Sequence, residues 1–452
     1  MTEKPAAESG LDAVPVLEID PLIDDLGTRI IVCCGAGGVG KTTTAAALGV
    51  RAAERGRRVV VLTIDPARRL AQSMGIDSLD NTPRKVEGIK ASDGGELHAM
   101  MLDMKRTFDE IVEAHADPGR ARAILENPFY QSLSAGFAGT QEYMAMEKLG
   151  QLRARDEWDL IVVDTPPSRS ALDFLDAPKR LGSFLDGKFI KLLMAPAKVG
   201  GRAGMKFLNV GMSMMTGTLG KLLGGQFLKD VQTFVAAMDT MFGGFRTRAD
   251  ATYRLLQAPG TAFLVVATPE RDALREAAYF VERLAAEAMP LAGLVLNRVH
   301  GSGAAGLSAE RARAAAENLD EGRMTDQAGG KTARSGSPAT SPELSDLATA
   351  AASSSVSPAA PTAEPAAQRT AADTVTEADT DTDVRHLTAG LLRLHAERMR
   401  VLAREQRTRN RFTALHPEVA VVEVAALPGD VHDLAGLRAI GDRLTTGHTP
   451  ST

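Results

Sequence analysis

The stretch that decides the fold is Gly35-Ala36-Gly37-Gly38-Val39-Gly40-Lys41-Thr42. It satisfies the phosphate-loop pattern G-x-x-x-x-G-K-[ST] and lies between an apolar, β-branched run at 29–34 and an alanine-rich helical stretch at about 41–55, as that pattern requires. Its glycines let the backbone turn so that successive N–H groups face phosphates, assisted by the N-terminus of the helix. The alternative is a glycine-rich turn that binds nothing.

We therefore predict that this loop binds ATP. Lys41 is expected to reach the β- and γ-phosphates, and the Thr42 hydroxyl is expected to be a ligand of Mg²⁺. The nucleotide-binding residues predicted here are Gly35, Ala36, Gly37, Gly38, Val39, Gly40, Lys41, Thr42 and Thr43.

Outward from the loop, apolar runs typical of buried strands alternate with helical patterns. Such alternation predicts an α/β fold of the P-loop NTPase type, in which helices flank both faces of a mostly parallel sheet. Further strands are predicted at 58–64, 96–102, 160–163, 262–267, 291–296 and 419–424, and helices at 269–288 and 431–444.

Four segments depart from this alternation. Helical stretches at about 104–155 and 170–256 predict an inserted helical subdomain, whose part 187–245 is rich in glycine and methionine. Residues 301–383 hold few large apolar side chains and predict a disordered linker, with a helix near 309–319 as an exception. The acidic N-terminus, 1–28, is predicted to be flexible. The ATPase domain then comprises 29–300 and 384–446, the latter opening on a basic amphipathic helix.

Composition limits the classes of partner and compartment. The net charge of -5 and an aromatic content of 4% disfavour nucleic acid and anionic membranes as partners. The two cysteines, Cys33 and Cys34, are strand neighbours that point to opposite faces, so no disulfide is expected between them. No apolar run predicts a signal peptide or a stable membrane anchor. A cytoplasmic location is predicted.

The G-x-G-G-V-G-K-T-T form of the loop resembles the deviant phosphate loop of the arsenite-pump, tail-anchored-protein-targeting, ParA and MinD ATPases. That resemblance implies a signature lysine directly after the first glycine, which reaches the partner's nucleotide across a dimer interface. This chain has Ala36 there. Three explanations remain open: a heteromeric partner supplies the lysine, Arg68 or Arg69 replaces it, or hydrolysis is weak.

Two aspartates follow strands in segments that resemble the switches of this family. Asp65 heads Asp65-Pro66-Ala67, and the resemblance implies that it orients the attacking water; a helix cap is the alternative. Asp164 heads Asp164-Thr165-Pro166-Pro167-Ser168, and a carboxylate at this strand end suits Mg²⁺ held through water. Lys41 and Asp65 are the predicted catalytic residues, and Thr42 and Asp164 the predicted metal site.

Two later segments resemble the family's adenine pocket. Asn297 ends a strand, and its amide is able to donate to and accept from a base edge. Pro428-Gly429-Asp430 resembles a loop that closes over the base. A strand-end cap and an ordinary turn are the alternatives.

The sequence thus predicts an Mg²⁺-dependent ATPase of the arsenite-pump and targeting type, in which nucleotide drives a homo- or heterodimer switch that controls a hydrophobic or tail-anchored client. Arsenite transport is disfavoured because metalloids need soft thiolates and the only cysteines precede the loop. One alternative is a nucleotide-binding subunit that needs a lysine-bearing paralogue for activity. A ParA- or MinD-like positioning ATPase is a third.

Overall fold

The computed structural model describes residues 15–64, 68–91, 94–128, 130–131, 140–166, 234, 244, 247–328 and 373–446. The chain divides into two compact units, Met1–Gly301 with Glu405–Thr452 and Ser302–Arg404. Each unit is described by itself below.

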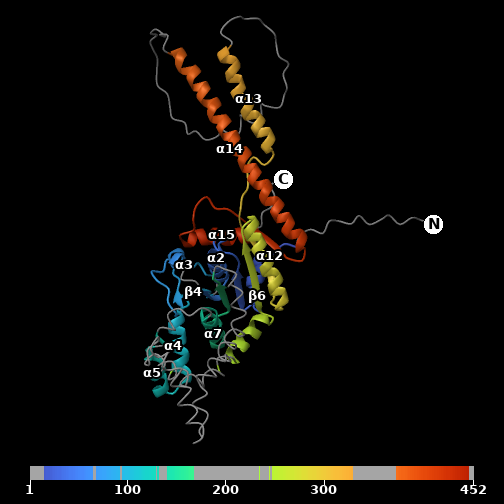
Figure 1. The fold of residues 1–452 in the computed structure, drawn as a ribbon. Coiled ribbons are helices and arrows are strands. Elements are labelled where there is room, and N and C mark those ends of the chain that lie inside the picture. The colour runs from blue at the N-terminus through green and yellow to red at the C-terminus, as the bar shows by residue number, and fades with distance from the viewer. Residues whose placement is uncertain are drawn as a thin grey trace, which may run out of the picture. The chain divides into compact units, whose positions relative to one another are not determined.

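The first unit is built on one eight-stranded sheet of order β3-β4-β2-β5-β1-β6-β7-β8 (Figure 1). Every neighbouring pair is parallel except β3 and β4. This confirms the predicted α/β class with a mostly parallel sheet. The strands are β1 (Ile30–Cys34), β2 (Arg58–Thr63), β3 (Arg84–Lys85), β4 (Glu96–Met101), β5 (Leu160–Asp164), β6 (Thr261–Ala267), β7 (Leu291–Val299) and β8 (Val421–Ala425).

Helices cover both faces of the sheet. Alternate side chains of β1 enter two separate hydrophobic cores, Ile30 and Val32 on one face and Ile31 and Cys33 on the other. The first core also takes side chains from α4 (Met104–His115), α5 (Pro118–Leu125), α7 (Thr140–Arg155) and α12 (Arg271–Ala286). The second takes them from α1 (Ile19–Asp24), α2 (Lys41–Glu54), α3 (Arg68–Ser73) and α15 (Leu434–Thr446).

The central position of β1 places its carboxyl end beside the ends of two other strands. It pairs with β5 on one side and β6 on the other, with Cys33 opposite Asp164 in the register. Ligands of open α/β sheets bind at the carboxyl ends of the strands. The sheet therefore brings the segment after β1 and the last residue of β5 to one place.

The predicted flexible N-terminus, 1–28, requires correction over its described part. Val16 forms a parallel bridge with Val421, which adds residues 15–17 to the β8 edge. Ile19 and Ile23 of α1 are buried, with 1% and 0% of their surface exposed. The acidic, proline-containing composition obscured these apolar residues at helical spacing, whose burial anchors the segment.

Part of the predicted helical insertion is present. α4, α5 and α7 occupy the first stretch, 104–155, and a helical segment at 247–257 ends the second. The glycine- and methionine-rich part, 187–245, lies outside the described residues except for Phe234 and Gly244.

The second unit contains two helices within or beside the predicted linker. α13 (Ala309–Ala328) lies wholly inside the stretch predicted as disordered, 301–383, whereas α14 (Asp373–Leu415) begins inside it and continues into the first unit from Glu405. The helix expected near 309–319 is present as the first part of α13, whose alanine, glutamate and arginine are strong helix formers. The division of the chain at Glu405 also differs from the predicted boundary at 384.

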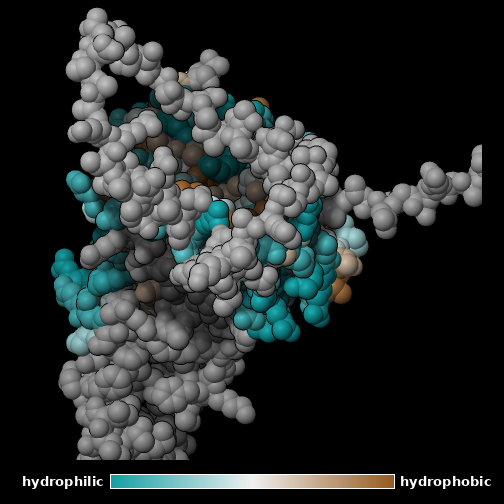
Figure 2. All heavy atoms as spheres, turned by 90° about the horizontal axis from the view of Figure 1, so that it is seen from above, coloured by the Kyte–Doolittle hydropathy of each residue, from teal (hydrophilic) through white to brown (hydrophobic). Residues whose placement is uncertain are grey.

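The described residues include no helix that is both long enough and apolar enough to cross a membrane. Where the space-filling view is coloured, hydrophilic side chains dominate and hydrophobic ones show only in small areas (Figure 2).

Candidate functional site

The phosphate loop turns on glycines that no other residue replaces without strain. Gly35 has φ of 149°, and a Cβ there would lie 2.1 Å from the Val266 carbonyl oxygen of β6. Gly40 caps α2 with φ of 96°, and its Cβ would lie 2.3 Å from Asn297 Nδ2. Positive φ and close approach both demand glycine. The loop is thus wedged between β6 and the end of β7.

Lys41 begins α2 and is buried, with 5% of its surface exposed. Its Nζ donates to the Ala36 carbonyl oxygen at 2.8 Å, so the side chain folds back over the loop. Ala36 is itself buried. The loop therefore carries one ammonium group and no cation at its second position.

The head of α2 and the end of β5 meet at a carboxylate. Thr42 Oγ1 donates to Asp164 Oδ2 at 2.6 Å, and Thr63 Oγ1 at the end of β2 donates to the same oxygen at 3.0 Å. Asp164 is fully buried. Hydroxyl and carboxylate oxygens are the donors that Mg²⁺ prefers in P-loop sites, so this pair fits that ion. Elsewhere, the described part of the chain holds no group of three or more His, Cys, Asp or Glu suited to a metal.

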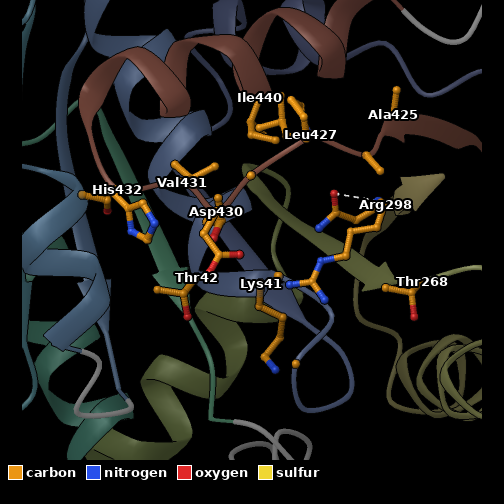
Figure 3. A pocket seen from close by; sticks show the side chains of 18 of the residues that line it. Lys41, Thr42, Thr268, Arg298, Ala425, Leu427, Asp430, Val431, His432 and Ile440 are labelled. Carbon is orange, nitrogen blue, oxygen red and sulfur yellow. Dashed lines mark hydrogen bonds between the residues drawn. The ribbon is translucent and has the colours of Figure 1, made fainter. Parts of the chain in front are cut away.

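A cavity of about 870 Å³ opens beside the loop. Figure 3 shows Lys41 and Thr42 on one side, Arg298 on another, and Asp430 and His432 from the segment after β8 facing them. Of the predicted nucleotide-binding residues, those that line the cavity are Gly38, Gly40, Lys41, Thr42, Thr43, Asn297, Pro428, Gly429 and Asp430. The cavity volume lies in the usual range for ligand sites. The fold therefore gathers the loop, the end of β7 and the segment after β8 around one space.

Asn297 braces the phosphate loop. Its Nδ2 donates to the Val39 carbonyl oxygen at 2.8 Å, and its Oδ1 accepts from the Arg298 backbone N–H at 2.9 Å. Only 8% of its surface is exposed. This amide thus holds the loop in place at the cavity edge, a structural role in addition to the predicted contact with adenine.

Residues of the cavity wall that were not predicted from the sequence include Arg298, His300 and Glu405. Arg298 is exposed, lines the cavity and has φ of 59°, which is unusual for a residue with a side chain. His300 lines the same wall and its Nδ1 lies 2.7 Å from Glu405 Oε1. Arg298 directly follows Asn297, and this adjacency is the signal that the sequence offered.

Some predicted roles concern residues whose placement is not described. Asp65 lies outside the described residues, and the side chains of Arg68 and Arg69 at the start of α3 do too.

Cys33 and Cys34 are described: both are buried thiols without a disulfide. Burial raises the pKa of Cys34 to about 12 and that of Cys33 well above its usual range. Such thiols are poor sources of the thiolate that a metalloid needs.

The comparisons with known proteins agree with this geometry. The family model described as anion-transporting ATPase matches residues 28–317. ATPase GET3 of Malassezia globosa is 31% identical over 160 residues, which cover 35% of this chain and 45% of that protein. ATPase GET3 of Podospora anserina is 25% identical over 283 residues, covering 62% and 76%. The ATPase ASNA1 homolog of Entamoeba histolytica is 28% identical over 184 residues, covering 39% and 54%. In two of these three alignments the chain spans only about half of the relative.

Proposed function

The chain belongs to the anion-transporting ATPase family, and on that premise we propose that it binds ATP with Mg²⁺ in the cavity beside the phosphate loop and hydrolyses it. The observation that carries the proposal is the contact between Thr42 and Asp164. It joins a hydroxyl at the head of α2 to a carboxylate at the end of β5, two residues that are 122 positions apart in the chain. A glycine-rich turn with no ligand would need no such pair.

The proposed roles in binding ATP and Mg²⁺ are distributed over several described residues. Lys41 and the N-terminus of α2 provide positive charge for the phosphates. Thr42 and Asp164 would hold Mg²⁺, which neutralises charge on the phosphate oxygens when bound. Asn297 fixes the loop, and Pro428, Gly429 and Asp430 border the remaining space for the base and ribose.

We further propose that Asp65 positions the attacking water. The support comes from its neighbours: β2 ends at Thr63, which contacts Asp164, and the Ile64 N–H donates to the Asp164 backbone carbonyl at 3.0 Å. Residue 64 therefore lies at the end of the sheet where Thr42 and Asp164 meet, and Asp65 is the next residue in the chain. A carboxylate there is suited to hold a water for in-line attack.

The charge missing at Ala36 is proposed to come from a partner. A cation supplied across an interface accelerates phosphoryl transfer by roughly 10³–10⁵. In the described part of the cavity wall the permanent cations are Lys41 and Arg298. Two sources of this charge therefore compete. One is the lysine of a paralogous partner in a heteromer, and the other is Arg298, Arg68 or Arg69 of the same chain.

Coupling to a client is the further part of the proposal. The glycine- and methionine-rich stretch 187–245 has the composition of an adaptable apolar surface, since methionine is unbranched and polarizable. We propose that nucleotide-driven dimer closure reshapes this stretch around a hydrophobic client.

The test of the hydrolysis proposal is steady-state phosphate release by the full chain, alone and with a lysine-bearing paralogue, beside the variants Asp164→Asn and Asp65→Asn. Asp164→Asn keeps the size of the side chain and removes its charge, so we expect ATP affinity to become independent of Mg²⁺. Asp65→Asn should keep Mg²⁺-dependent binding and lose turnover.

Each assignment has its own contradicting result. Turnover of Asp65→Asn at the wild-type rate would remove Asp65 from the mechanism. High turnover of the wild-type chain alone would remove the need for a partner. ATP binding by the chain alone, with turnover only when the lysine-bearing paralogue is present, would favour the nucleotide-binding subunit as the function.

A further inference from the structure

Glu405 carries a buried oxygen in the wall of the cavity that no protein group pairs. The residue belongs to the part of α14 in the first unit, and 14% of its side chain is exposed. Its Oε2 is buried and accepts no hydrogen bond; among the described residues that line the cavity, no other buried side-chain polar atom lacks a partner. A buried acceptor without a hydrogen bond destabilises a fold, so native proteins keep few of them. The oxygen therefore indicates a ligand that brings a hydrogen-bond donor.

His300 and the packing of α14 fix this carboxylate in place. His300 Nδ1 lies 2.7 Å from Glu405 Oε1. A carboxylate accepts hydrogen bonds and does not donate them, so Nδ1 carries the hydrogen of this contact. The next turns of α14 are held against the sheet, since Arg409 pairs with Glu423 of β8 and Phe412 is buried in the first core. Oε1 is thus engaged, and Oε2 is available to a donor in the cavity.

The carboxylate lies at the end of the cavity away from the phosphate loop. Asn297 contacts the loop through Val39, and His300 is three residues farther along the chain, at most about 10 Å at the rise of a strand. The intervening Val299 accepts at its carbonyl oxygen from the Ala426 N–H at 3.0 Å, which brings His300 beside the segment after β8. A nucleotide whose phosphates lie at the loop therefore presents its nucleoside to this end.

The walls near this end suit the flat faces of a base. Ala425, Leu427 and Ile440 line the cavity. Figure 3 shows them on the side opposite Lys41, so they lie away from the phosphate-binding end. Ligand sites usually combine apolar walls with a few placed polar groups, and the polar groups set the specificity. Glu405 is such a polar group beside apolar walls.

Asn297, the residue expected from the sequence to contact adenine, is a weak source of base specificity. Both ends of its amide already have a partner, Val39 at Nδ2 and the Arg298 N–H at Oδ1. An amide also presents a donor and an acceptor together, whereas a carboxylate presents acceptors alone. We propose that Glu405 Oε2 accepts a hydrogen bond from the 6-amino group of adenine and so selects adenine among the bases. This proposal rests on the proposed binding of ATP in the same cavity.

The purine bases differ at the atom that Glu405 would meet. Adenine carries the N6 donor, whereas guanine and hypoxanthine carry the O6 acceptor in its place. An O6 facing Oε2 would set two acceptors against each other, and a site built to hydrogen-bond one group rejects the analogue that lacks it. The ribose hydroxyls are also donors, so the ribose is the competing partner of Oε2, and the experiment separates the two.

The test is isothermal titration of the full chain with Mg²⁺ and four diphosphates, which avoid turnover: ADP, IDP, purine riboside diphosphate and 2′-deoxyADP. The wild type should bind ADP about tenfold more tightly than IDP or purine riboside diphosphate, and 2′-deoxyADP as tightly as ADP. Glu405→Gln keeps an oxygen for His300 and puts an NH₂ donor in place of Oε2, so IDP should gain affinity and ADP should lose it. Glu270→Gln, at an exposed glutamate of the same cavity, is the matched control and should leave the ratio unchanged.

Three results would overturn the proposal, and they differ in what they leave standing. Equal affinity of the wild type for ADP, IDP and purine riboside diphosphate, or the same ADP preference in Glu405→Gln, would remove Glu405 from base recognition and leave the ATP site intact. A penalty for 2′-deoxyADP that Glu405→Gln abolishes would assign Oε2 to the ribose. Failure of every nucleotide to bind would overturn the ATP site itself, and this contact with it. The comparison on the wild type needs no variant, so a folding defect in Glu405→Gln would not protect the proposal.

Discussion

Asn297 donates from Nδ2 to the Val39 carbonyl oxygen at 2.8 Å, which ties the end of β7 to the phosphate loop across 258 residues of chain. The same nitrogen lies where a side chain at Gly40 would have to go. The phosphate loop and the end of β7 are therefore packed together. A substitution at Gly40 should displace Asn297, and a substitution at Asn297 should loosen the loop.

Gly40→Ala should destabilise the protein more than Gly38→Ala. Both glycines have positive φ, which costs a residue with a side chain about 1–2 kcal/mol. Only Gly40 adds a collision, at 2.3 Å from Asn297, whereas a Cβ at Gly38 meets nothing within 4 Å. Urea unfolding without nucleotide measures the difference. Adding Asn297→Ala to each variant should shrink it, and an unchanged difference would contradict the collision as its cause.

Arg298→Ala should weaken ATP binding about tenfold, because a guanidinium that lines the cavity is lost. The loss should diminish at high salt, since exposed charges are screened. Isothermal titration at two salt concentrations measures it. Arg271→Ala, which removes an exposed arginine of α12 that does not line the cavity, is the matched control.

The left-handed backbone of Arg298 gives a second, independent readout. Arg298→Gly removes the same guanidinium but relieves the φ of 59°. It should be more stable than Arg298→Ala by about 1 kcal/mol in urea unfolding, with the same ATP affinity. Equal stability of the two variants would show that the backbone there carries no strain.

Arg57→Ala should destabilise the first unit by roughly 3 kcal/mol, because a buried guanidinium is lost and four carbonyl groups each lose one hydrogen bond. Arg57 donates to the carbonyl oxygens of Ile23, Asp25, Thr28 and Asp159 at 2.6 to 3.2 Å. The neighbouring Arg58→Ala removes an exposed arginine and should cost less than about 1 kcal/mol. Chemical denaturation compares the two, and similar losses would contradict the anchoring role of Arg57.

Acid should weaken the attachment of α1 to α2. The hydrogen bonds from Arg51 hold the pKa of Asp20 below its ordinary value of 3.8. A carboxylate whose pKa is lower in the folded chain stabilises the fold above the unfolded pKa, and this contribution is lost as the pH falls through the folded pKa. Asp20→Asn should therefore lower the stability at pH 7 by roughly 1 kcal/mol and flatten its decline below about pH 4. Asp442→Asn, at a mostly exposed partner of Arg51, should do less.

The sequence by itself determined the sheet, the phosphate loop and the positions of most strands. These depend on local patterns: glycine spacing, apolar runs and their repeat are written in consecutive residues. Composition was a weaker guide in the segments taken to be flexible or disordered. Few apolar residues at the right spacing sufficed to anchor α1, and the helix expected near 309–319 extends to Ala328 as α13.

Only the tertiary structure decided which distant residues meet. The register of parallel strands sets Thr63 beside Asp164, and the crossover order places β7 where Asn297 reaches Val39. The left-handed turn of Arg298 and the side of α14 that faces solvent follow from packing of whole elements. Such contacts join segments more than a hundred residues apart, so no local pattern specifies them, and the free energy of the complete fold selects them.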